Sequence, residues 1–116
     1  MGDLSAHFSR WEFRDHTTGE LIGPSDNLVE HLERLRGIVG RPIVIVSGYR
    51  SPSHNRAVGG ARRSYHLLGR AADLRSGVVT VDEAVAAGFG GIGRCGKWVV
   101  HVDDRRVAHP VIFDDC

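Results

Sequence analysis

The chain has 116 residues, which is enough for one hydrophobic core, and we expect a single domain over residues 1–116. Apolar residues make up 41% of the sequence and charged residues 25%, as in soluble globular proteins. No apolar stretch reaches the roughly 18 residues that a membrane span needs, so we expect none. The formal net charge is only +1, and this near-neutral balance argues against a nucleic-acid-binding protein.

Neither the cysteines nor the start of the chain indicates an exported protein. Cys95 and Cys116 are too few for a disulfide scaffold and have no C-x-x-C spacing, so we expect two free thiols. The first residues lack a basic segment followed by an apolar one, which predicts no signal peptide. We therefore expect the chain to be cytoplasmic when it is synthesised.

The first half of the chain predicts one long helix and one buried strand. Three early aromatic residues, Phe8, Trp11 and Phe13, are spaced as anchors for a short turn against the core. From Ser25, a candidate N-cap, an amphipathic pattern predicts a helix that Gly40 ends. Its apolar stripe consists of Leu28, Leu32, Leu35 and Val39. The β-branched run at residues 42–46 then predicts a strand buried on both faces.

The second half predicts a second helix and further strands. Thr80 and Glu83 form a capping-box pattern, so a short helix is expected after Thr80, with Gly88 at its end. Residues 89–94 read as a glycine-rich strand or bend, and residues 97–103 as the strongest strand of this half. A last, edge-like strand is expected over residues 107–113. Together these elements predict an α+β fold, a small antiparallel sheet with flanking helices.

A glycine-rich loop over residues 47–74 carries the first candidate site. Within it, His66 and Asp73 are the residue types that bind metal ions, and we expect both to bind one ion. On the strand at 97–103, alternation places Val99, His101 and Asp103 on one face. Because burying a His and an Asp without partners is unfavourable, His101 is the natural third ligand. Two histidines and one carboxylate with an open position favour zinc, while Fe(II) uses a similar set. From the residue types alone, the alternative is a set of polar residues whose hydrogen bonds are satisfied within a loop.

Several short motifs follow one another from the middle of the chain to its last third. They are Ser47-Gly48-Tyr49-Arg50-Ser51-Pro52, Asn55, Val58-Gly59-Gly60, Ser64-x-His66-x-x-Gly69-x-Ala71-x-Asp73 and His101-Val102-Asp103. In this order they resemble the M15-type zinc D-Ala-D-Ala carboxypeptidases, which share their fold with Hedgehog signalling domains. The resemblance is closest to small phage-lysin-like members, and it implies the Hedgehog/DD-peptidase fold.

The resemblance implies a role for each matching residue. His66, Asp73 and His101 correspond to the ligands of one zinc ion per chain. Arg50 corresponds to an arginine that pairs with a substrate carboxylate or carbonyl, and its alternative role is a loop-bracing ion pair. Ser64 corresponds to a serine that binds substrate, with a structural turn hydrogen bond as its alternative.

One position departs from the family's pattern. Well-studied members place an acidic general base three residues before the last histidine, and here that residue is Trp98. The nearest carboxylate on the same strand is Asp103. Asp103 would either accept the proton of the attacking water or orient His101, and the sequence leaves both roles open.

The resemblance implies a zinc metallopeptidase that hydrolyses peptidoglycan peptides, as a carboxypeptidase or an endopeptidase. Such an enzyme, acting as a monomer, would reach the cell wall after release by another system or as a virion component. The first alternative is a catalytically inactive, metal-stabilised binding or structural module on the same fold. The second alternative is nucleic-acid binding, which would use an arginine cluster. That cluster consists of Arg56, Arg62, Arg63 and Arg70.

Overall fold

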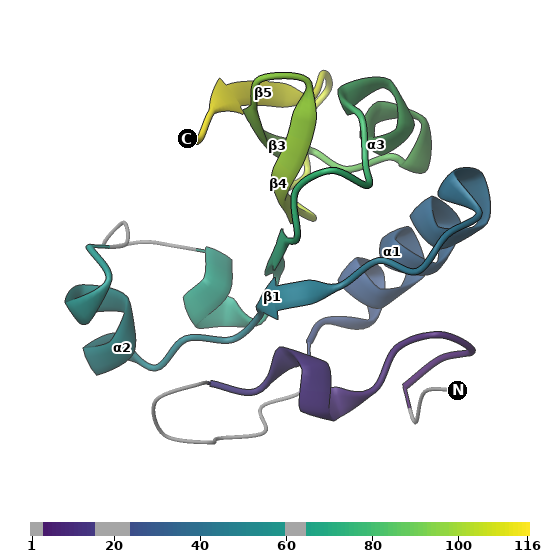
Figure 1. Ribbon diagram of the computed structural model, residues 1–116. Helices are drawn as coiled ribbons and strands as arrows, with labels where there is room; N and C mark the ends of the chain where they lie inside the picture. The colour runs from purple at the N-terminus through teal and green to yellow at the C-terminus, as the bar shows by residue number, and fades with distance from the viewer. Residues whose placement is uncertain (1–3, 16–23, 60–64) are drawn as a thin grey trace.

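The computed structural model describes residues 4–15, 24–59 and 65–116 (Figure 1). Its helices are α1 (Asp26–Val39), α2 (Pro52–Ala57) and α3 (Val81–Ala87), with two short 3-10 helices, η1 (Arg10–Phe13) and η2 (Tyr65–Leu68). Its strands are β1 (Ile45–Ser47), β2 (Ala71–Leu74), β3 (Gly91–Cys95), β4 (Trp98–Asp103) and β5 (Val111–Asp114). The predicted α+β class is therefore confirmed. No helix in the described ranges is both long and apolar enough to cross a bilayer.

The five strands form one sheet in the order β1-β2-β4-β3-β5. Neighbouring strands run antiparallel except β3 and β5, which pair in parallel, so the sheet is mixed where an antiparallel one was predicted. The reason is the return of the chain after β4. Residues 104–110 carry it across the sheet to the far side of β3, and β5 then runs in the direction of β3 (Figure 1).

The two faces of the sheet differ in chemistry. One face packs against α1 and α3 and forms the hydrophobic core. The core includes Leu28, Leu32 and Leu35 from α1, Ala84 and Ala87 from α3, and Ala72, Leu74, Ile92, Val99 and Val102 from the strands. The other face carries Asp73, His101 and Asp103, which line a cleft. Apolar burial on the first face therefore holds in place the strands that present polar groups on the second.

The helix ends follow the predicted signals. The Ser25 hydroxyl accepts a hydrogen bond from the Leu28 backbone N–H, and α1 ends at Gly40, whose φ is 71°. Thr80 and Glu83 form the predicted capping box before α3. The Ser25 hydroxyl also donates to the buried Asp104 carboxylate, which tethers the start of α1 to the end of β4.

Strand β4 contains a bulge that the sequence did not indicate. The register against β3 steps from Gly93 opposite His101 to Arg94 opposite Val99, so Val100 is an extra residue on β4. As a result, Val99 packs in the core while Val100 and His101 both line the cleft. The prediction that Val99 shares a face with His101 and Asp103 is therefore wrong, and it holds only for the two polar residues.

Strand β1 and the aromatic start also differ from prediction. Strand β1 lies at the edge of the sheet, and Val46 is 50% exposed, so the predicted burial on both faces is wrong. An isolated β-branched run has no signal that separates an edge strand from a central one. At the start, Phe8 and Phe13 are buried as predicted anchors, while Trp11 is 60% exposed and packs with Arg14 instead.

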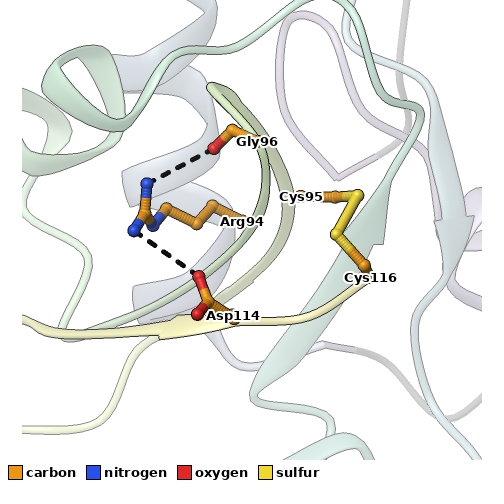
Figure 2. The surroundings of a disulfide bond; sticks show 5 residues. All are labelled: Arg94, Cys95, Gly96, Asp114 and Cys116. Atoms are coloured by element: carbon orange, nitrogen blue, oxygen red, sulfur yellow. Dashed lines mark hydrogen bonds and ion pairs between the residues drawn. A yellow bond between two sulfur atoms is a disulfide. The ribbon is translucent and has the colours of Figure 1, made fainter.

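Cys95 and Cys116 form a disulfide, so the prediction of two free thiols is wrong (Figure 2). The parallel pairing of β3 with β5 brings the two residues together, with their Cα atoms 4.7 Å apart. That separation of the Cα atoms suits a disulfide, whereas a sequence separation of 21 gives no local signal. The bond fixes the last residue of the chain to the end of β3.

Candidate metal centre

His66 is held in the buried floor of the cleft by a backbone carbonyl. It lies on η2, and its Nδ1 is 2.6 Å from the Gly48 carbonyl oxygen. Because a carbonyl only accepts, Nδ1 donates the hydrogen bond, and this fixes the ring with Nε2 toward Asp73 and the cleft. Gly48 itself lies against the Phe13 backbone, so closely that any larger side chain would overlap it. The buried N-terminal turn thereby supports the loop that orients His66.

Asp73 and His101 face each other across two paired strands. They occupy directly opposite positions on β2 and β4. Asp73 Oδ1 is 3.1 Å from His101 Nδ1 and 3.2 Å from His66 Nε2. One donor atom from each of the three residues lies within 4.8 Å of the others, a separation that a single metal ion can bridge.

The atoms that face away from this centre have partners of their own. Asp73 Oδ2 accepts a hydrogen bond from Arg50 Nη2 at 2.7 Å, and His101 Nε2 donates to Asp103 Oδ2 at 2.8 Å. Asp103 is fully buried and also accepts two hydrogen bonds from the guanidinium of Arg105. Each ligand is thus oriented from behind, as metal-binding His and Asp side chains usually are. The donor set fits zinc in number, type and orientation.

Asp73, His101 and Asp103 stabilise one another's charged forms. Burial raises the pKa of the Asp73 carboxyl, but hydrogen bonds and charge from His101 and His66 outweigh it and hold the pKa below its usual range. Burial likewise lowers the pKa of His101, while the hydrogen bonds that its ring donates to the Asp103 and Asp73 carboxylates raise the pKa to about 9. Asp103 is kept ionised in the same way by Arg105 and His101, despite its burial. The site therefore holds an ionised carboxylate ready for a cation.

Two glycines of β3 leave the space that the site occupies. Gly93 lies opposite His101 on β4, and Gly91 lies opposite Asp103. A Cβ atom at Gly91 would overlap both carboxylate oxygens of Asp103. One at Gly93 would come within 2.9 Å of His101 Cβ, the Phe113 ring and Asp115 Oδ2. These glycines are required because side chains from β4 and from the β5 segment converge over them.

The metal-ligand residues lie in an open cleft with a volume of about 680 Å³. Its charged and aromatic lining includes Arg50, Tyr65, Arg105, Phe113 and Asp115. Arg105 lies 4.9 Å from the centroid of the Tyr65 ring, which forms part of the same wall. The cleft combines cations, an anion and rings, a lining suited to a polar peptide rather than to a lipid.

The structure brings together most of the residues that the sequence singled out. His66, Asp73 and His101 meet, Asp103 lies behind His101, and Arg50 lies beside Asp73. Ser64 lies outside the described residues. Trp98 lies on β4 and is not among the residues that line the cleft.

Sequence reasoning missed Arg105 and Asp115, which also line the cleft. Arg105 could have been suspected from its position two residues after Asp103. Asp115 gave no signal, because its place depends on the parallel pairing of β5 with β3.

A family model described as Peptidase M15 matches residues 7–103. The match includes all three candidate ligands and Arg50, and it ends at Asp103, before β5 begins. A search of curated proteins found no match.

Proposed function

Because the chain belongs to the Peptidase M15 family, we propose that it is a zinc-dependent peptidase that hydrolyses amide bonds in peptidoglycan peptides. The single observation that supports this most is the His66–Asp73–His101 cluster, whose donor atoms converge in an open cleft. A cluster oriented from behind by a carbonyl, an arginine and a carboxylate is typical of a metal centre that works on a substrate.

His66, Asp73 and His101 would hold the ion and leave one position open toward the cleft. A bound zinc ion supplies a Lewis acid that makes a bound water a good nucleophile near neutral pH and polarises the scissile carbonyl. Arg50 is the proposed substrate-binding cation, since it lines the cleft with one edge of its guanidinium turned to Asp73. A peptide carboxylate beside the scissile bond suits such a planar set of donors. The family assignment leaves open whether the cleaved bond is terminal or internal.

For Asp103 we propose the orienting role rather than the proton-accepting one. Its two oxygens already accept hydrogen bonds from His101 and Arg105, and the side chain is fully buried. A general base needs an oxygen within reach of the attacking water. Holding the His101 ring with Nδ1 toward the ion is the task that these contacts support.

A catalytically inactive metal-binding module is the second candidate. The observation that favours it is Trp98, which stands where well-studied relatives carry their acidic base. Such a module would bind zinc and cell-wall peptides without cleaving them.

Digestion of purified muropeptides tests this proposal. The zinc-loaded protein is incubated with them, and the products are identified by mass spectrometry. We expect release of peptide fragments or D-alanine, lost in His66→Ala and after chelation, and restored to the wild type by added zinc. Zinc binding without any cleavage would favour the inactive module. Absence of zinc binding would refute both candidates.

Action on the wall also requires that the protein reach it. Release by a separate lysis system, or delivery within a virion, is part of the proposal, as is a monomeric single domain over residues 1–116. Gel filtration of the purified protein would test the monomeric state.

A further inference from the structure

The hydrolysis proposed above needs a carboxylate that can exchange a proton with the attacking water. Asp73 is itself one of the proposed ligands, and its other oxygen accepts a hydrogen bond from Arg50. Asp103 is buried between His101 and Arg105. On β4, Asp103 is the only carboxylate. A carboxylate that is free to exchange a proton therefore has to come from another element.

One row of residues crosses the cleft face of the sheet from β2 to β5. Asp73 lies opposite His101, His101 opposite Gly93, and Gly93 beside Phe113. The Phe113 ring is 5.5 Å from the His101 ring, between their centroids, so β5 reaches the metal centre. Along an extended chain, the residue two positions after Phe113 points to the same face, and that residue is Asp115.

The Asp115 carboxylate lies over Gly93, beside His101. Its Oδ2 is 2.9 Å from the point that a Cβ atom of Gly93 would occupy, and His101 Cβ is 2.9 Å from the same point. Asp115 lines the cleft together with His66, Asp73 and His101. The absence of a side chain at Gly93 is what leaves room for the carboxylate on the cleft face of the sheet.

Asp115 differs from the other carboxylates of the cleft in being unengaged. Within the described part of the chain, its side chain has no hydrogen bond or ion pair, and the residue is exposed. Its neighbour Asp114 instead turns away and pairs with Arg94 at 3.5 Å (Figure 2). A carboxylate without a partner, next to the ligands and open to solvent, can accept a proton from water.

The backbone around Asp115 is nevertheless fixed. Its N–H donates to the Arg94 carbonyl at 2.7 Å, which continues the β3–β5 ladder by one residue. The next residue, Cys116, is bonded to Cys95 (Figure 2). A hydrogen bond on one side and a disulfide on the other hold Asp115 in place although it lies beyond the end of β5.

We propose that Asp115 is the proton acceptor of the peptidase and that the Cys95–Cys116 disulfide positions it. The carboxylate takes one proton from the attacking water as the water oxygen bonds to the scissile carbonyl carbon. It then gives this proton to the amide nitrogen as the C–N bond breaks. The products are a carboxylate and an amine, and Asp115 returns to its ionised form. This inference rests on the proposed function.

The test compares Asp115→Asn with the matched control Asp114→Asn, in the full-length, zinc-loaded protein. We expect Asp115→Asn to lower kcat at least about 100-fold, the usual contribution of a general base, with KM unchanged. Zinc stoichiometry and affinity, measured by calorimetry, should equal those of the wild type in both variants. Asp114→Asn should keep its activity, because it changes a neighbouring carboxylate that pairs with Arg94 outside the cleft. Added formate should restore part of the activity of Asp115→Ala, which a purely structural role would not allow.

The possible outcomes separate this inference from the proposed function. An active wild type with an equally active Asp115→Asn would overturn the role of Asp115 and leave the peptidase intact. A raised KM with normal kcat would assign Asp115 to substrate binding and would also overturn its role as the proton acceptor. A variant that loses zinc together with activity would make the residue structural. A wild type that binds zinc but cleaves no peptide would overturn the proposed function and this inference with it.

Discussion

At the scale of single residues, the site depends on side chains that never touch the substrate. Asp103 is the main example, since it is fully buried and connects His101 to Arg105. Gly91 is another, since its lack of a side chain leaves room for that carboxylate. The properties of the metal centre should therefore change when residues behind it are altered.

Replacing Asp103 by Asn should weaken zinc binding about 10- to 100-fold, the usual effect of losing a carboxylate behind a ligating histidine. The amide keeps the shape of the side chain but loses the charge that pairs with Arg105 and supports His101. Competition with a chromophoric chelator measures the affinity. Asp114→Asn removes an exposed carboxylate and serves as the control. Equal affinities for the two variants would contradict the orienting role.

Gly91→Ala should displace the Asp103 carboxylate, because the new methyl group would overlap both of its oxygens. Overpacking of this kind destabilises a protein by about 1–3 kcal/mol. We expect a loss of that size in chemical denaturation, together with weaker zinc binding. The control is Gly37→Ala on α1, where a methyl group meets nothing within 4 Å. An alanine at position 91 that leaves both quantities unchanged would show that the β3–β4 pairing is looser than described.

Zinc affinity should increase with pH up to about 9. In the metal-free protein, the hydrogen bonds that His101 donates to Asp103 and Asp73 raise the pKa of its ring to about 9, so the ring is protonated near neutral pH. The ion must displace that proton, and affinity falls about tenfold for each pH unit below the pKa. Calorimetry in two buffers of different ionisation enthalpy should detect about one proton released per zinc at neutral pH. No pH dependence would mean that His101 binds no ion.

At the scale of elements, the features that the sequence predicted best are those that depend on interactions between residues close together in the chain. The caps at Ser25, Gly40 and Thr80 were identified because a few neighbouring residues form them. The candidate ligands His66, Asp73 and His101 were grouped from their residue types and the alternation of the strand, and the family resemblance supported the same group.

Most of the features that the sequence missed depend on strand pairing. The bulge at Val100, the edge position of β1 and the contact between Cys95 and Cys116 follow from which strands lie side by side. Pairing partners are set by packing of the whole sheet, and a single sequence carries little record of them. The place of Asp115 in the cleft was hidden for the same reason.

Removing the disulfide should affect stability and turnover but leave metal binding intact. Closing a loop of this length contributes about 2–4 kcal/mol by restricting the unfolded chain. Cys95→Ser with Cys116→Ser should therefore unfold at lower denaturant and show a reduced kcat, because Asp115 loses one of its two tethers. Zinc affinity should be retained, since no ligand lies on β5. Full turnover in the double variant would show that the β3–β5 ladder alone positions the carboxylate.

At the scale of the whole molecule, one face of the sheet forms the core and the other carries the candidate site. Its inner face packs on α1 and α3, and its outer face holds the ligands, so substitutions on the outer face can change chemistry without opening the core. The candidate ligands come from η2, β2 and β4, so one bound ion would link parts of the chain that lie far apart in sequence. The C-terminal strand then completes one wall of the cleft.

The Cys95–Cys116 bond would make the proposed activity depend on redox conditions. Reducing compartments keep cysteines as free thiols, whereas the oxidising space around a cell wall lets disulfides form and persist. A hydrolase whose proton acceptor is tethered by such a bond would work slowly inside the cell that makes it and faster at the wall. The same bond that shapes the cleft would then protect the producing cell from its own enzyme.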